Sequence, residues 1–121
     1  MIEMIKKLYA ILDNIVSIFR NSMTYSKKSR ILRDYMKVLY HNKRKNEIRL
    51  SGLRIKYCNY ELFECLYKEI FIKNDYFFMS EKKDPFIIDC GSNIGMSVLF
   101  FKRVYPLSKI IAFEPDAHAF K

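Results

Sequence analysis

A glycine-containing loop and two acidic residues lie close together near the C-terminal end of the sequence. The loop, residues 89–95, reads Asp89-Cys90-Gly91-Ser92-Asn93-Ile94-Gly95. Gly91 can leave a strand without a Cβ clash and can let the backbone approach a ligand closely. Asn93 stands where such loops often have glycine, and Asn is among the few other residues that tolerate a positive φ. This pattern is typical of a loop that holds a small cofactor.

Glu114 follows Gly95 by nineteen residues. This is the usual reach of an acid that accepts hydrogen bonds from both hydroxyls of a ribose. We therefore predict cofactor contacts from Asp89, Gly91, Ser92, Asn93, Gly95 and Glu114. The alternative is that Asp89 and Glu114 are loop or cap carboxylates with no ligand. No catalytic residue is assigned.

The charge at this loop distinguishes between cofactors. A nicotinamide cofactor places a pyrophosphate at such a turn and usually requires G-x-G-x-x-G, whereas the spacing here is G-x-N-x-G. Asp89, two residues before Gly91, would also repel a pyrophosphate. S-adenosylmethionine has no phosphate and carries an ammonium and a sulfonium, so the acid favours it. A nicotinamide-dependent dehydrogenase is the disfavoured third interpretation.

The elements around the loop indicate a parallel βαβ unit. Residues 86–88 form a short apolar run, which predicts a strand buried on both faces. A helix is expected from Met96 until Pro106 stops it, and Gly95 should let that helix pack close to the strand. A second buried strand follows over residues 109–114. The crossover should be right-handed.

The first half of the chain is predicted to be helical and then to form a hairpin. Residues 1–20 show helical periodicity, with an apolar face that docks on its own domain or on a second copy; a membrane surface is the alternative. A second helix is expected over residues 29–40, capped by Ser29, and residues 42–46 resemble a linker. Alternating residues on both sides of Ser51-Gly52 predict a hairpin. A helix capped by Asn59 should follow. The aromatic residues 76–78 could form a short strand or an aromatic wall beside the ligand, and core packing is the favoured interpretation.

Composition bounds the remaining possibilities. The 121 residues fit one domain at most, and the net charge of +9 resides in residues 1–60, which hold 14 Lys and Arg against 4 acids. A solvated basic face is the favoured interpretation. The cysteines, Cys58, Cys65 and Cys90, form no CxxC pair, so no metal site is expected; Cys90 should be a small packing residue. No apolar run is long enough for a membrane span, and we expect a cytoplasmic protein.

The stretch from Phe86 to Phe120 resembles the FkbM-type methyltransferase family, whose hallmark is D-x-G-x-N-x-G followed by F-E-P. The matching residues are Asp89, Gly91, Asn93, Gly95 and Phe113-Glu114-Pro115. The resemblance implies a class I, Rossmann-like domain of seven strands that uses S-adenosylmethionine. It also implies methyl transfer to a hydroxyl of a small-molecule or saccharide acceptor, such as a sugar or secondary metabolite.

These observations predict an α/β chain in two parts. Residues 1–46 would be a basic helical extension, and residues 47–121 the N-terminal part of a methyltransferase domain. Because the sequence stops after the second parallel strand, we expect an N-terminal fragment that is inactive alone. A homo-oligomer could form through the first helix, whereas neither nucleic acid nor a membrane is the favoured partner. The alternative function is a non-catalytic module whose basic half binds RNA, anionic polysaccharide or lipid.

Overall fold

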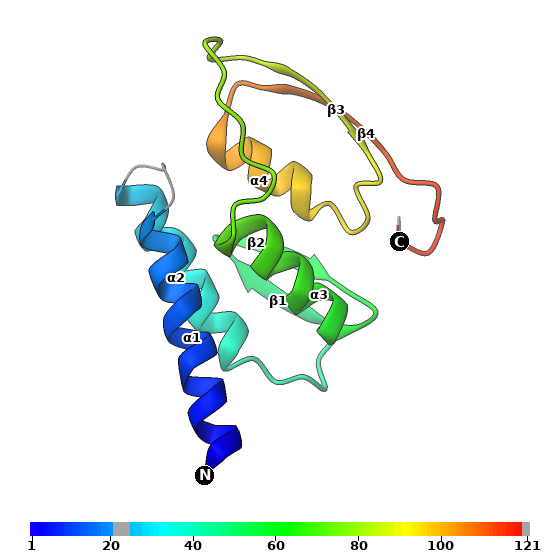
Figure 1. Cartoon of the computed structure of the whole chain (residues 1–121). Helices are drawn as coiled ribbons and strands as arrows, with labels where there is room; N and C mark the ends of the chain where they lie inside the picture. The colour runs from blue at the N-terminus through cyan, green and yellow to red at the C-terminus, as the bar shows by residue number, and fades with distance from the viewer. Residues whose placement is uncertain (21–24, 120–121) are drawn as a thin grey trace.

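The computed structural model describes residues 1–20 and 25–119. The elements in chain order are α1 (Ile2–Arg20), α2 (Tyr25–Leu39), β1 (Glu47–Leu50), β2 (Leu53–Lys56), α3 (Tyr60–Tyr67), the π-helix η1 (Lys68–Ile72), β3 (Phe86–Cys90), α4 (Met96–Val104) and β4 (Lys109–Phe113). The helical pair α1 and α2 flanks the β1–β2 hairpin and α3, and the β3–α4–β4 unit lies beyond them (Figure 1).

The two N-terminal helices run antiparallel (Figure 1). The second begins at Tyr25, so the prediction that Ser29 caps its start is wrong. Ser29 instead lies inside the helix, where its hydroxyl donates a hydrogen bond to the Ser26 carbonyl oxygen. A serine within a helix can satisfy its side chain in this way, so it does not have to mark an end. Ile31, Tyr35 and Val38 form the buried face of α2.

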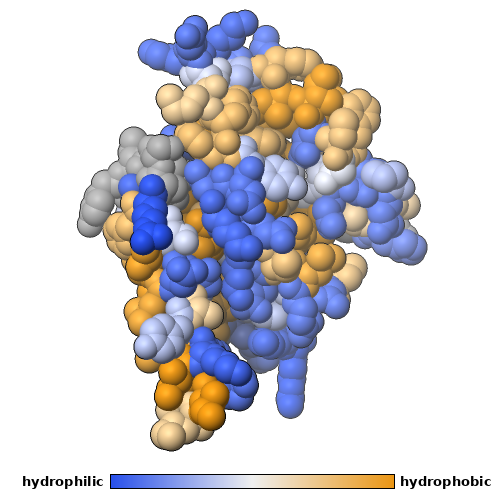
Figure 2. All heavy atoms as spheres, in the orientation of Figure 1, coloured by the Kyte–Doolittle hydropathy of each residue, from blue (hydrophilic) through white to orange (hydrophobic). Residues whose placement is uncertain are grey.

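Most of the apolar face of α1 is not buried. Ile18 is fully buried and Ile15 packs partly against the core, but Leu8 and Leu12 are about half exposed at 57% and 49%. Of the two docking partners predicted for this face, the described part of the chain covers only its C-terminal end, and a second copy stays a prediction. The helix projects past the end of α2, and its apolar atoms are visible at the lower left of Figure 2.

The predicted hairpin is confirmed, with β1 and β2 antiparallel and Leu50 paired with Leu53. Ser51 and Gly52 both have positive φ, 48° and 86°, as a two-residue type I′ turn requires. The Asp34 carboxylate of α2 holds this turn, because it accepts hydrogen bonds from the Ser51 amide at 3.0 Å and the Ser51 hydroxyl at 2.5 Å. The hairpin is thereby fixed to the helical pair.

Asn59 caps α3 as predicted, accepting a hydrogen bond from the Leu62 amide at 2.9 Å. The helix then continues as η1, a π-helical turn that the periodicity did not predict. A row of aromatic rings in contact runs past this segment in the order Tyr57, Phe63, Tyr67, Phe71 and Phe100, with stacked, tilted and edge-to-face pairs. This row connects the hairpin to α4, so one core cluster extends from Ile18 to Phe101.

The βαβ unit has the predicted order and direction. Strands β3 and β4 are parallel, with Asp89 opposite Ala112 and Cys90 opposite Phe113. The expectation of burial on both faces is wrong: α4 covers the Ile87 face, but Phe86 and Ile88 are 61% and 60% exposed. The alternating side chains of two strands present one face to α4, and no described element covers the other.

Residues 76–78 form no strand, so the strand prediction for them is wrong, and the ring contacts of Phe78 and Tyr76 are those of packing. Phe78 lies 5.2 Å from Tyr105 and 6.0 Å from Phe101, measured between ring centroids, and stays partly exposed. Among the described residues, no helix is long and apolar enough to cross a membrane. The expected division at residue 46 stays a prediction.

Candidate cofactor site

The loop at the end of β3 is built from alternating left-handed residues. Gly91, Asn93 and Gly95 have φ values of 94°, 50° and 81°, which confirms the positive φ expected at Asn93. The amides of Gly91 and Ser92 both donate to the Phe113 carbonyl oxygen, at 2.8 and 3.1 Å. These bonds hold the loop against the carboxyl end of β4, the position where open α/β sheets bind ligands.

The two glycines are required for their backbone conformation and not for close packing. A Cβ added to Gly91 or Gly95 would meet no other atom within 4 Å, so the expectation that Gly95 brings the helix close to the strand is wrong. Gly95 is instead the left-handed N-cap of α4. The open space beside Gly91 fits a loop whose backbone a ligand can approach.

Asp89 is 8% exposed at the carboxyl end of β3. Its Oδ2 accepts a hydrogen bond of 2.5 Å from the hydroxyl of Ser97, in the first turn of α4. Its Oδ1 has no partner among the described residues and is not closed off from solvent. One carboxylate oxygen is thus fixed by the protein, and the other remains available to an ammonium group or a water.

Glu114, one residue past β4, accepts two backbone hydrogen bonds. Its Oε2 receives the Asn93 amide at 2.6 Å, and its Oε1 receives the Asp116 amide at 2.8 Å. A carboxylate offers about four acceptor positions, so one remains on each oxygen. The amides orient the carboxylate and leave it able to accept a hydrogen bond from each hydroxyl of a vicinal diol.

The structure therefore brings the six predicted residues to one end of the β3–β4 pair. Asp89, Gly91, Asn93 and Glu114 have the positions that the pattern implied. Ser92 is buried and is held through its backbone: its amide donates to the Phe113 carbonyl oxygen, and its own carbonyl oxygen accepts from the Gly95 amide. Cys90 is exposed at the end of β3, so the expectation of a packing residue is wrong there.

A cavity of about 160 Å³ adjoins the loop. Asn93 and Ile94 form one side, Asp116 and His118 come from the segment after β4, and Tyr57 and Asn59 come from the hairpin and the start of α3. Sequence reasoning did not include Asp116, His118 or Tyr57 in the site. The sequence signal for Asp116 was its place two residues after Glu114. In the structure, its carboxylate accepts a hydrogen bond from the His118 amide at 2.9 Å.

The described residues contain no group of three or more His, Cys, Asp or Glu side chains that could hold a metal ion. The arrangement of Asp89 and Glu114 fits S-adenosylmethionine, which presents an ammonium and a ribose diol, better than it fits a pyrophosphate.

Two curated proteins are similar to parts of this chain. "Methyltransferase sdnD" of Sordaria araneosa is 50% identical over 50 residues, 41% of this chain and 19% of that protein. "Methyltransferase 1" of Beauveria bassiana (strain ARSEF 2860) is 49% identical over 57 residues, 47% of this chain and 23% of that protein. The matched stretches thus span about a fifth of each relative's length.

These similarities support a methyltransferase in general terms, and methyltransferases of this kind imply use of S-adenosylmethionine. No family model and no solved structure match the chain. The narrower FkbM assignment and the seven-stranded Rossmann-like domain therefore stay predictions.

Proposed function

We propose that this chain supplies the S-adenosylmethionine-binding part of an FkbM-type methyltransferase. The observation that carries the proposal is the Glu114 carboxylate, which two backbone amides orient beside the loop while each oxygen keeps one acceptor position. The names of the two relatives support the same class of enzyme.

In this proposal each part of the site has a separate role. Glu114 accepts hydrogen bonds from the two ribose hydroxyls, and the free oxygen of Asp89 faces the amino group directly or through a water. Gly91 and Asn93 give the loop a left-handed backbone conformation that lets the cofactor lie directly against the backbone. S-adenosylmethionine, when bound, supplies an electrophilic methyl group on its sulfonium.

The proposed acceptor is a hydroxyl on a sugar or secondary metabolite. The contribution of the protein would be positioning, because a hydroxyl oxygen held in line with the sulfonium methyl needs little further covalent assistance. The residue that takes the hydroxyl proton is not assigned.

Calorimetric titration of the chain with S-adenosylhomocysteine tests the proposal. We expect Glu114→Gln to weaken binding by about 10- to 100-fold, because hydrogen bonds to a charged group contribute roughly 1.5–3 kcal/mol. Glu81→Gln is the matched control, because Glu81 is exposed and has no partner among the described residues. This variant should bind S-adenosylhomocysteine with unchanged affinity. Equal affinity in the Glu114 variant, or no binding to the unaltered chain, would overturn the assignment.

Competition distinguishes the cofactor class. NADH should not displace S-adenosylhomocysteine, because its pyrophosphate would meet the Asp89 carboxylate. Displacement at comparable concentrations would favour a dinucleotide site instead.

A further inference from the structure

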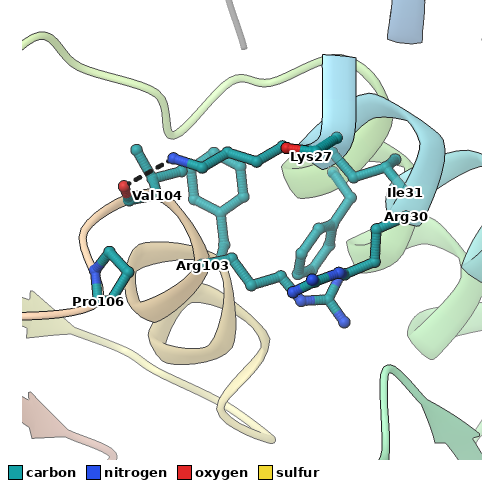
Figure 3. Close-up of a pocket in the computed structure, with 9 residues that line it drawn as sticks. Lys27, Arg30, Ile31, Arg103, Val104 and Pro106 are labelled. Carbon is teal, nitrogen blue, oxygen red and sulfur yellow. Dashed lines mark hydrogen bonds between the residues drawn. The ribbon is translucent and has the colours of Figure 1, made fainter. Parts of the chain in front are cut away.

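A second cavity, of about 210 Å³, lies between α2, η1 and the C-terminal end of α4. Its polar edge is formed by Lys27 and Arg30 from α2 and by Arg103 from α4, and its apolar part by Ile31, Phe71 and Phe100. Figure 3 shows the side chains of Arg30 and Arg103 running toward one another from these two helices. The cavity therefore combines converging cations with an apolar floor.

The three cations are only partly satisfied by the protein. Lys27 Nζ donates one hydrogen bond of 3.0 Å to the Val104 carbonyl oxygen, as the dashed line in Figure 3 marks. Arg30 has no hydrogen-bond or ion-pair partner among the described residues. No acidic side chain is among the described residues that line the cavity. Asp34 offsets part of the charge of Arg103 from outside the cavity lining, and an anion between Lys27 and Arg30 would be favourable because these two cations have no acidic partner among the described residues.

Arg103 gives the most specific indication. Its side chain is 13% exposed, and its Nη2 lies 2.9 Å from Asp34 Oδ2. Its guanidinium carbon lies over the Phe71 ring, 4.9 Å from the ring centroid. Its Nη1 is buried without any hydrogen-bond partner. A buried donor without a partner is costly, so this edge of the guanidinium would gain a hydrogen bond if it turned toward an oxyanion in the cavity.

The apolar floor and the size of the cavity indicate what the anion is attached to. A cavity of about 150 Å³ lined by apolar side chains can hold one benzene molecule, so 210 Å³ leaves room for one ring and an anionic group. Drug-sized ligands usually occupy about 300 Å³ or more. The cavity therefore fits a fragment-sized ligand.

We infer that this cavity is a binding site for a small organic oxyanion, a carboxylate or phosphate carried on an apolar body about the size of one ring. Arg30 and Lys27 contact the oxyanion, Arg103 turns its unpartnered edge toward it, and Phe71 and Phe100 contact the apolar body.

This site is separate from the proposed cofactor site. Val104 and Pro106, which line the cavity, lie where α4 ends and the chain leads into the start of β4. Glu114, by contrast, follows the other end of β4. Figure 1 shows the end of α4 beside α2 and the carboxyl ends of β3 and β4 on the far side. Its ligand would therefore be neither the methyl donor nor the acceptor held against it.

Titration of the ¹⁵N-labelled chain with phenyl phosphate, followed by ¹H–¹⁵N chemical shifts, tests the inference. We expect saturable shifts at the amides of Lys27, Arg30 and Val104. Inorganic phosphate, which has the charge without the ring, and benzyl alcohol, which has a ring without the charge, should each bind at least tenfold more weakly. Absence of saturable shifts, or equal binding of inorganic phosphate, would overturn the inference.

Two variants of α2 separate this site from general attraction to a basic surface. Arg30→Gln should weaken phenyl phosphate at least fivefold, whereas Arg33→Gln removes the same charge from an exposed position outside the cavity and should change affinity less than twofold. An equal loss in both variants would show nonspecific attraction and contradict the inference. Glu114→Gln should leave phenyl phosphate binding unchanged, so this result is independent of the methyltransferase proposal.

Discussion

The left-handed conformation of Asn93 is a residue-scale feature with a measurable cost. Its φ is 50°, and its side chain has no partner among the described residues. We expect Asn93→Ala to lower the free energy of unfolding by about 1–2 kcal/mol, the usual penalty for a Cβ in this region. Asn93→Gly should stay within about 0.5 kcal/mol of the unaltered chain. Urea unfolding measures both, and an equal loss in the two variants would point to an unrecognised side-chain contact.

His41 should make stability depend on pH. Its Nε2 lies 2.6 Å from the Tyr57 hydroxyl oxygen, and burial, followed by the charge of Lys45, lowers the pKa of its imidazole. The unfolded chain, with the ordinary His pKa of about 6.5, therefore binds more protons than the folded chain at slightly acidic pH. The contribution of His41 to the free energy of unfolding is complete above about pH 6.5. It is lost as the pH falls from that value to the lower pKa of the folded state.

An NMR titration checks the shift directly. The His41 ring proton should titrate at lower pH in the folded chain than in urea, and Lys45→Gln should raise the folded midpoint, since it removes the second cause. A folded midpoint at or above the unfolded one would refute the assignment.

The positions of Asp89 and Glu114 could be predicted from the sequence, but their contacts could not. Both residues follow short apolar runs that predict strands, and this places each acid at the end of a strand. The bond from the Asn93 amide to Glu114 depends on parallel register, which brings residues 21 apart in sequence together. The cavity beside the loop also includes Tyr57, whose approach depends on how the hairpin packs. Long-range packing of this kind has no local sequence signal.

At the scale of elements, Asp34 joins α2, the hairpin turn and α4. It is 1% exposed and accepts from Ser51 and from Arg103 Nη2. Asp34→Ala should lower the free energy of unfolding by about 3–5 kcal/mol, because it leaves the Arg103 charge buried without its partner. Such a loss is a large fraction of the stability of a small domain.

Urea unfolding followed by circular dichroism provides the measurement for Asp34. Asp34→Asn, which keeps the shape and one acceptor, should lose less than Asp34→Ala. Asp13→Ala is the matched control, since Asp13 is an exposed helical aspartate without a partner among the described residues, and it should stay within about 0.5 kcal/mol. A similar loss of unfolding free energy in the Asp13 and Asp34 variants would contradict the proposal that Asp34 joins α2, the hairpin turn and α4.

The differences between predicted and observed elements have local physical causes. The hairpin and α4 were predicted because Ser51-Gly52 and Pro106 impose their conformations on the backbone. The start of α2 was missed because Ser29 can bond within a helix as well as cap one. The π-helical turn η1 was missed because tertiary packing places Ile70, Phe71 and Ile72 in the core, and a single turn has no distinct period.

At the scale of the whole molecule, two apolar surfaces are left without a described cover. One lies on β3 and β4 and consists of Phe86, Ile88, Ile111 and Phe113, which are 46–61% exposed. The other lies along α1. Figure 2 shows apolar atoms over both regions, with hydrophilic atoms between them. Groups of exposed apolar side chains are typical of interfaces, so we predict association in solution.

We expect α1 to drive that association. Its exposed Ile5, Leu8, Leu12 and Phe19, together with half-buried Ile15, follow the alternating spacing of three and four residues that pairs helices. Leu12→Lys should therefore shift sedimentation toward the monomer, because one copy would place a charge in the apolar seam of the other. Ile88→Lys places the same charge on the exposed face of β3 and is the matched comparison. Association that survives Leu12→Lys but disappears with Ile88→Lys would assign the interface to the sheet instead.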